Sequence, residues 1–303
     1  MNISIVIPAK NEEDNISQCL KALKSQISEF NEIIVVDNGS TDNTVSIAKL
    51  YTDKVYVKPK FSLSELRNYG ARKSSGKVIA FLDADCIVSE KWICQIQKTL
   101  EDVEIGCTGS TPVAPQNGSW VEAVWSSFRT RRKRKCYTSW INSSNFIVRR
   151  DYFFCVGGFN DEVKTCEDVD ICMRLNKICK ILFDPSINVV HLGEPKTVKQ
   201  FLLKEIWRGK GTVSGVISHG FVLSELKSLI LPVYYLFSAL GLVIALFAFG
   251  YKYIFAYLAL CLFPAFIFAV WMTANTKKIN YFFGYLILFL VYASARTIAL
   301  FAR

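Results

Sequence analysis

Two aspartates, Asp83 and Asp85, flank a single alanine directly after a hydrophobic run of the chain. Carboxylates at positions i and i+2 beside a loop are able to hold a hard divalent cation such as Mg²⁺ or Mn²⁺ through oxygen ligands. A cation held in this way neutralises charge on a diphosphate leaving group. Because an Asp-x-Asp pair is also common in solvated turns, its interpretation depends on the segments around it.

Two more polar, acidic segments follow hydrophobic runs, and they span residues 8–13 and 37–42. A carboxylate such as Asp37 accepts hydrogen bonds from a nucleobase N–H group or from ribose hydroxyls. The first segment is able to place the backbone of Pro8 and Ala9 and the side chain of Glu12 on the same nucleoside. The simpler interpretation of the second segment is an Asn-Gly turn that leads into a helix.

The strands before these segments must bring them together. Short apolar runs alternate with stretches of helical spacing over the first 110 residues. They predict strands at 3–7, 32–36, 54–57 and 77–82, and helices at 16–27, 44–51, 66–73 and 89–100. Near-continuous apolar strands that alternate with helices predict a parallel sheet covered on both faces. Ligands of such sheets bind at the carboxyl ends of the strands, where all three acidic segments are expected.

The order and spacing of these segments resemble the family 2 glycosyltransferases of the GT-A fold over about residues 2–210. The resemblance rests on residues 7–13 (IPAKNEE), 35–42 (VVDNGSTD), 66–71 (LRNYGA), 81–85 (FLDAD), 157–159 (GGF), 166–170 (CEDVD) and 190–191 (VH). It implies an α/β domain with a Rossmann-like mixed sheet. It also implies a nucleotide-diphospho-sugar donor, inverting transfer and a Mg²⁺ or Mn²⁺ ion at Asp85.

The resemblance also implies roles for single residues. Asp37 would bind the donor base, Asp83 the ribose or the metal, and His191 the metal, while Arg67 would lie near the donor. Asp168 would be the catalytic base. Inverting transfer needs such a carboxylate, because the acceptor hydroxyl must lose its proton while it attacks the anomeric carbon.

Three further residues are possible acceptor or diphosphate contacts. Glu167 precedes the expected base, although an acidic residue at a helix N-terminus is often only a complement to the helix dipole. Arg208 and Lys210 follow an amphipathic stretch that predicts an interfacial helix with a basic loop.

The C-terminal part of the chain is apolar and basic. Residues 229–303 contain five basic side chains and no acidic one, whereas the first 228 residues carry 31 basic and 26 acidic side chains. Three stretches are long enough to cross a bilayer, at 229–248, 253–272 and 281–301. The first two form either a tight hairpin of spans or a re-entrant pair. Lys277 and Lys278 between the last two favour a cytoplasmic loop. Arg296 in the third is expected at an interface or on a lipid phosphate.

A basic run, Arg131, Arg132, Lys133 and Arg134, follows an amphipathic stretch. Beside a membrane domain, anionic lipid headgroups are its expected partner, and a solvated helix end is the alternative. A nucleic-acid partner is not expected, because the rest of the N-terminal domain is nearly balanced in charge.

We therefore expect a GT-A domain at 1–210, a juxtamembrane linker at 211–228 and a membrane domain at 229–303, in an integral membrane protein whose catalytic domain is cytoplasmic. The expected activity is metal-dependent, inverting transfer of a sugar to a membrane-associated glycan or lipid-linked acceptor. The alternatives are a polyprenyl-phosphate sugar synthase with a phosphate nucleophile and a non-catalytic sugar-nucleotide sensor. A processive polymerase is disfavoured, because three helices are too few for an export channel.

Overall fold

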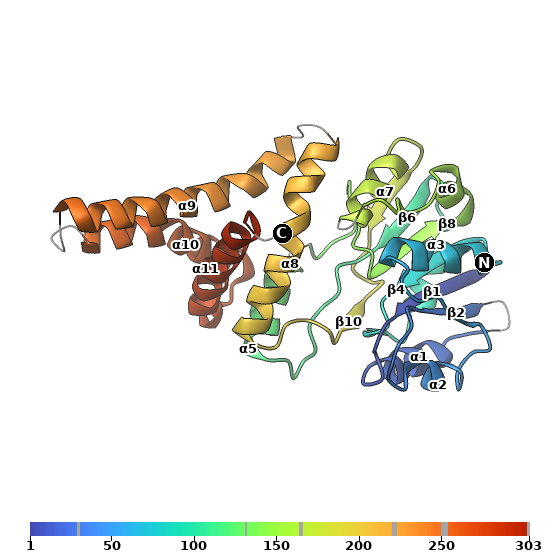
Figure 1. Cartoon of the computed structure of the whole chain (residues 1–303). Helices are drawn as coiled ribbons and strands as arrows, with labels where there is room; N and C mark the ends of the chain where they lie inside the picture. Colours follow the sequence, from blue (N-terminus) through green and yellow to red (C-terminus); the bar gives the residue numbers. More distant parts are fainter. Residues whose placement is uncertain (29–30, 131, 164–165, 220–222, 250–253, 302–303) are drawn as a thin grey trace. The chain divides into compact units, whose positions relative to one another are not determined.

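The computed structural model describes residues 1–303 except 29–30, 131, 164–165, 220–222, 250–253 and 302–303. Side chains at 210–229 and at some positions between 239 and 260 are also outside the description. The chain divides into two compact units, which Figure 1 shows. Met1–Pro115 and Arg132–Gly193 form the first, and Gln116–Arg131 and Glu194–Arg303 form the second.

The first unit is an α/β domain built on a mixed sheet. The described strands follow the order β3-β2-β1-β4-β8-β6-β9-β7, and β5 and β10 form a separate two-stranded sheet. The strands are β1 (Ile3–Ala9), β2 (Glu32–Asp37), β3 (Val55–Val57), β4 (Val78–Leu82), β5 (Cys86–Val88), β6 (Ile105–Gly109), β7 (Cys136–Tyr137), β8 (Asn145–Arg149), β9 (Lys180–Phe183) and β10 (Val189–His191). The helices are α1 (Ile16–Lys24), α2 (Thr44–Ala48), α3 (Leu63–Lys73), α4 (Trp92–Thr99), α6 (Arg150–Cys155) and α7 (Glu167–Leu175).

The predicted parallel arrangement holds for the first half of the sheet. Strand β1 pairs in parallel with β2 and β4, and β2 pairs in parallel with β3. Strand β8 then enters antiparallel between β4 and β6, which makes the sheet mixed. The carboxyl ends of β1, β2 and β4 therefore lie at one edge, as the sequence predicts.

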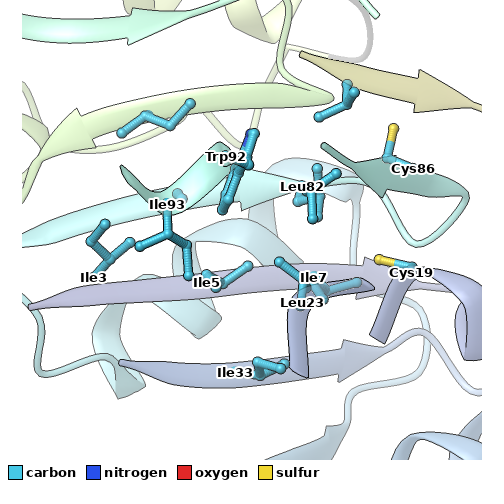
Figure 2. Packing of buried hydrophobic residues seen from close by; sticks show 14 of the residues in the cluster. Ile3, Ile5, Ile7, Cys19, Leu23, Ile33, Leu82, Cys86, Trp92 and Ile93 are labelled. Atoms are coloured by element: carbon cyan, nitrogen blue, oxygen red, sulfur yellow. The ribbon is translucent and has the colours of Figure 1, made fainter. Parts of the chain in front are cut away.

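Alternating side chains of β1 supply a core on each face of this sheet. Ile3, Ile5 and Ile7 pack with residues of α1 and α4, among them Leu23 and Trp92 (Figure 2). On the opposite face, Val6 joins Phe81, Phe146 and residues of α6 and α7. The site at the strand ends thus rests on two packed layers.

Helix α3 lies close to β1 and begins at Leu63, three residues before the predicted helix. Ser62 accepts a hydrogen bond from Glu65 N, and the Glu65 carboxylate accepts one from Ser62 N, which completes a capping box. A Cβ at Gly70 would come within 2.3 Å of Val6 Cγ1. Glycine is needed here because the helix and the strand approach so closely, and this contact fixes the position of α3.

The second unit is helical. It comprises α5 (Trp120–Arg129), α8 (Val198–His219), α9 (Leu223–Phe249), α10 (Ile254–Thr276), the short η2 (Ile279–Tyr281) and α11 (Phe282–Ala299). Helix α11 contacts α5, α8, α9 and α10. Its buried Tyr285 and Leu288 pack with Val121 and Val124 of α5 and with Phe201 of α8.

These contacts place the division between the units at Gly193, earlier in the chain than the expected 210. Residues 194–210 associate with the C-terminal helices because Phe201 and Gly209 pack within them; a Cβ at Gly209 would come within 2.5 Å of Ala299 Cβ. The expected linker at 211–228 falls on the end of α8 and the start of α9, and residues 220–222 between them lie outside the described residues.

One segment of the described chain, Ile279–Ala299, is long and apolar enough to cross a bilayer. It coincides with the third expected span. The other two fall on α9 and α10, where the described apolar stretches, Ile230–Ile244 and Cys261–Thr276, are shorter. A bilayer core needs about 20 apolar residues. The prediction of three membrane-spanning helices is therefore not supported, and one candidate span remains.

Candidate active site

An open cleft lies in the first unit where the loops after β1, β2 and β4 meet. Its volume is about 240 Å³. It is lined by Pro8, Ala9, Lys10, Glu12, Asn38, Leu63, Leu66, Asp83, Ala84 and Asp85. The structure thus brings together five of the residues expected to bind the donor or the metal, namely Pro8, Ala9, Glu12, Asp83 and Asp85. Lys10, Asn38, Leu63, Leu66 and Ala84 are additional lining residues.

Strands β5 and β10 bring His191 to Asp85. Their antiparallel register sets His191 opposite Cys86, and His191 Nε2 lies 3.2 Å from Asp85 Oδ1. The potential ligand atoms of Asp85, Cys86 and His191 all lie within 4.8 Å of one another. The carboxylate of Asp85 suits Mg²⁺ or Mn²⁺, and a neutral imidazole is a common ligand of divalent transition metals, whereas the softer thiol of Cys86 suits neither Mg²⁺ nor Mn²⁺.

The backbone beside this pair is shaped around the Asp85 carboxylate. A Cβ at Gly193 would lie 1.9 Å from Asp85 Oδ2, so only glycine leaves the carboxylate its present position. Leu192 N also donates a hydrogen bond to Asp85 O at 2.8 Å. Asp85 and His191 therefore fit a divalent cation, and Asp83 lines the same cleft.

Arg67 joins Asp83 to Glu167. Its Nη2 lies 2.8 Å from Asp83 Oδ1 and its Nη1 lies 2.8 Å from Glu167 Oε1. The Arg67 side chain has no exposed surface, whereas Asp83 is 29% exposed. Burial by itself lowers the pKa of Arg67, but the charges and hydrogen bonds of Asp83 and Glu167 raise it above its ordinary value. Arg67 therefore stays a cation.

Asp168 lies next to Glu167 in the first turn of α7. Its Oδ1 accepts a hydrogen bond from Val169 N at 2.9 Å, and its Oδ2 accepts one from Ser143 N at 3.4 Å. Burial, and then the neighbouring charge of Glu167, raise the pKa of Asp168 to about 6, against lowering effects of Trp140, Arg67 and Ser143. A carboxylate with this pKa is mostly ionised at neutral pH, yet it binds a proton more readily than an ordinary aspartate.

Asp170, in the same turn, is occupied elsewhere. It pairs with Arg174, whose Nη1 also donates to Gly158 O at 2.7 Å. The Asp170 carboxylate is therefore already paired within α7. Gly158 has a φ of +74°, and a Cβ there would meet Asn68 Oδ1 at 2.6 Å.

The first two loops hold Asp37 and Glu12 in different surroundings. Asp37 is fully buried and accepts hydrogen bonds from Ser40 N and Ser40 Oγ, so its carboxylate shapes the turn. Its neighbour Asn38 lines the cleft and donates to Phe61 O at 3.0 Å. Burial raises the pKa of Glu12, and the hydrogen bond from Asn15 opposes this. The sequence analysis did not predict Asn38 as a cleft residue, although Asn38 directly follows Asp37.

The remaining basic residues separate into different environments. Arg208 belongs to the second unit, where it donates to Glu205 Oε1 at 2.6 Å, and the side chain of Lys210 lies outside the described residues. In the basic run, Arg131 is also outside the description. Arg132 donates to Thr138 Oγ1 at 2.6 Å, and Lys133 and Arg134 are exposed.

Arg296 has a partner that the sequence did not predict. Its Nη2 lies 2.8 Å from Glu205 Oε2, and the Glu205 side chain is only 1% exposed. The guanidinium also lies 4.9 Å from the centroid of the Tyr292 ring. Within the second unit, Arg296 is thus paired with a carboxylate, where a lipid phosphate or a membrane interface was expected.

The mixed α/β sheet with acidic loops at its strand ends agrees with a GT-A-like fold, and comparison with known proteins identifies the family. Residues 4–157 match the model of glycosyl transferase family 2, so the chain belongs to that family and is a glycosyltransferase. It is 28% identical over 224 residues to glycosyltransferase AglE of Haloferax volcanii, covering 70% of this chain and 73% of AglE. It is also 31% identical over 142 residues to the uncharacterized glycosyltransferase YibD of Escherichia coli, covering 44% of this chain and 39% of YibD.

Solved structures agree with the fold. The mannosyltransferase PcManGT of Pyrobaculum calidifontis, in complex with GDP-Man and Mn²⁺, aligns with a TM-score of 0.67 at 18% identity, over 98% of this chain and 87% of PcManGT. GalNAc-T7 with UDP, GalNAc and Mn²⁺ aligns with a TM-score of 0.54 at 20% identity, over 75% of this chain and 53% of that one. At these identities the likeness establishes the GT-A-like fold.

Proposed function

We propose that the protein transfers a sugar from a nucleotide-diphospho-sugar, with inversion, to an acceptor associated with a membrane. The observation that carries this proposal is the link in one unit between the cleft carboxylate Asp83 and the Glu167–Asp168 pair, through Arg67. The structural neighbours that contain GDP-Man, or UDP with GalNAc, together with Mn²⁺ support a nucleotide-sugar donor and a divalent cation.

Different residues of the site would bind the metal, bind the nucleoside and accept the proton in such a reaction. Asp85 and His191, with Asp83, would hold Mg²⁺ or Mn²⁺, which supplies positive charge to the diphosphate leaving group when bound. Pro8, Ala9, Glu12 and Asn38 form the wall for the nucleoside, and Asp37 shapes its turn. Asp168 takes the proton of the acceptor hydroxyl, since its raised pKa suits a general base near neutral pH.

The second unit supports a membrane location. Ile279–Ala299 is the candidate span, and α9 and α10 expose large apolar side chains such as Phe237, Phe247 and Phe255. Exposed apolar surface of this extent is costly in water and favourable in lipid. With Lys277 and Lys278 before the span, we place the catalytic unit on the cytoplasmic side.

The test is nucleotide release by the full chain in detergent. The assay offers UDP-, GDP- and dTDP-sugars with Mn²⁺, Mg²⁺ or EDTA and a membrane lipid extract, and compares wild type with Asp168→Asn. We expect release from one donor class that EDTA and Asp168→Asn both abolish. Release that persists in Asp168→Asn would favour a phosphate acceptor, which needs no base. Nucleotide binding without release from any donor would favour the sensor.

A further inference from the structure

Arg67 sits at a junction between the two halves of the site. It comes from α3, and its two terminal nitrogens each contact a different carboxylate at 2.8 Å, Asp83 on the cleft side and Glu167 beside the base. Ser143 Oγ donates to the same Glu167 oxygen at 3.1 Å, and Ser143 N donates to Asp168. Glu167, Asp168 and Arg67 are therefore held in one hydrogen-bonded group.

The neighbouring residue strengthens this link. Asn68 Nδ2 donates to Phe159 O at 2.8 Å and to Asp161 Oδ1 at 2.9 Å, while Phe159 N donates to Asn68 Oδ1 at 2.9 Å. The Phe159 ring lies 5.5 Å from the Arg67 guanidinium. Asn68 thus holds residues 159 and 161, and Arg67 holds Glu167 at the start of α7.

Arg67, which the resemblance places near the donor, is already engaged by other residues of the chain. Its side chain has no exposed surface, and both terminal nitrogens are already paired with carboxylates. Its Nε is buried without a hydrogen-bond partner among the described residues. An unpaired buried N–H costs stability, so a residue that served stability alone would be better satisfied.

Resting on the proposed function, we propose that Arg67 is a positioning residue that couples the donor side of the cleft to the base. It holds Asp83 in place for the donor and, through Glu167, holds Asp168 in place for the acceptor. A disturbance at one carboxylate is thereby transmitted to the other. Lysine cannot replace this arginine, because a single ammonium group cannot reproduce the two hydrogen bonds that the planar guanidinium makes to two separate carboxylates.

The experiment compares Arg67→Lys and Glu167→Gln with wild type and with Arg149→Lys as matched control. Among the described residues, Arg149 donates to the backbone carbonyls of Leu100, Ile105 and Asp102, so its replacement tests the general cost of changing a partly buried arginine. All variants are made in the full chain. The readouts are hydrogen–deuterium exchange of peptides covering 81–85 and 167–171, and kcat and KM for nucleotide release from the donor that wild type uses.

We expect Arg67→Lys to raise exchange in both peptides, to raise the donor KM and to lower kcat at saturating donor at least tenfold. Glu167→Gln should raise exchange mainly in 167–171 and lower kcat with KM within about twofold, and Arg149→Lys should leave both peptides unchanged. If Arg67→Lys raises KM alone, Arg67 is a donor ligand, and if it raises exchange without changing kcat or KM, its role is structural. Either result overturns the proposal. If wild type releases nucleotide from no donor, the proposed function fails, and the exchange data still decide whether Arg67 couples the two segments.

Discussion

Gly193 and Asp85 are in such close contact that a Cβ at position 193 would overlap Asp85 Oδ2, at 1.9 Å. The atom it would meet is the end of a side chain, which is able to rotate away, rather than backbone. The absence of a side chain at 193 is therefore a condition for the present orientation of the Asp85 carboxylate toward His191.

Replacing Gly193 by alanine should turn the Asp85 carboxylate away from His191. We expect Mn²⁺ affinity, measured calorimetrically in the presence of a nucleoside diphosphate, to fall at least tenfold with little change in melting temperature. Gly157→Ala is the control, because an added Cβ at Gly157 would meet no atom within 4 Å. The backbone φ of Gly157 is +82°, so alanine there adds backbone strain without touching the proposed metal site. That variant should lose about 1–2 kcal/mol of stability and keep its Mn²⁺ affinity. Unchanged affinity in Gly193→Ala would remove Asp85 from the proposed metal site.

Asp168→Asn should abolish turnover without weakening the donor complex. Removing a general base costs about 10²–10⁴-fold in rate, while the cleft residues stay in place. Single-turnover release and donor affinity, measured on the same preparation, separate the two effects. Asp170→Asn is the control, since Asp170 pairs with Arg174 and should affect stability more than turnover. Comparable turnover losses in both variants would argue against Asp168 as the base.

The same substitution should make the folded protein more stable at alkaline pH. Because the pKa of Asp168 in the folded state is raised to about 6, ionising it costs the folded state free energy above that pH. Asp168→Asn should therefore exceed wild type by about 1–3 kcal/mol near pH 8, and the difference should vanish below about pH 4. Denaturant unfolding at the two pH values measures it, and a variant less stable than wild type at pH 8 would contradict it.

Turnover should reach half its plateau near pH 6 and level off about one pH unit higher, because the base must be ionised. The charge of Glu167 is, after burial, the main cause that raises the pKa of Asp168. Glu167→Gln should therefore shift the acid limb of the rate profile to lower pH, in addition to lowering its plateau. A limb that moves to higher pH, or stays in place, would show that Glu167 does not act electrostatically on the base.

Glu205→Ala should destabilise the second unit, because it removes the buried carboxylate that pairs with both Arg208 and Arg296. Removing one member of a buried ion pair costs about 3 kcal/mol, whereas replacing Glu205 and Arg296 together by leucine costs less, because only the partly exposed Arg208 then loses its carboxylate. Unfolding of the full chain in detergent measures both variants. Glu104→Ala is the control, since its pair with Lys180 is exposed and should contribute little. If Glu205→Ala and the double leucine variant lose the same free energy of unfolding, the ion pair does not account for the stability that Glu205 provides.

The arrangement of the cleft was predictable because it follows from strand order. Parallel strands place their carboxyl ends at one edge, so Glu12, Asp83 and the turn after Asp37 had to approach one another. The Arg67–Glu167 pair was not predictable from the residues, since 100 positions separate its members and no periodicity connects them. The resemblance placed Arg67 near the donor, but only the structure gives it two carboxylate partners and no exposed surface.

The packing of the second unit was also hard to predict, because its contacts join residues far apart in the sequence. Helix α5 shows its apolar positions in the sequence, yet nothing there indicates that they pack against α11 rather than the sheet. Glu205 and Arg296, separated by 91 positions, also meet only through the packing of α8 on α11. Apolar periodicity predicts that a helix is buried, but it does not name the partner.

The antiparallel pairing of β5 with β10 also has a consequence for synthesis of the chain. Asp85 is made early, whereas His191 comes from the last strand of the first unit, about 100 residues later. A growing chain folds from its N-terminus, so the main sheet strands β1, β2 and β4 are present while the proposed metal site still lacks its imidazole. A nascent enzyme therefore acquires this ligand only when synthesis has reached the border of the second unit.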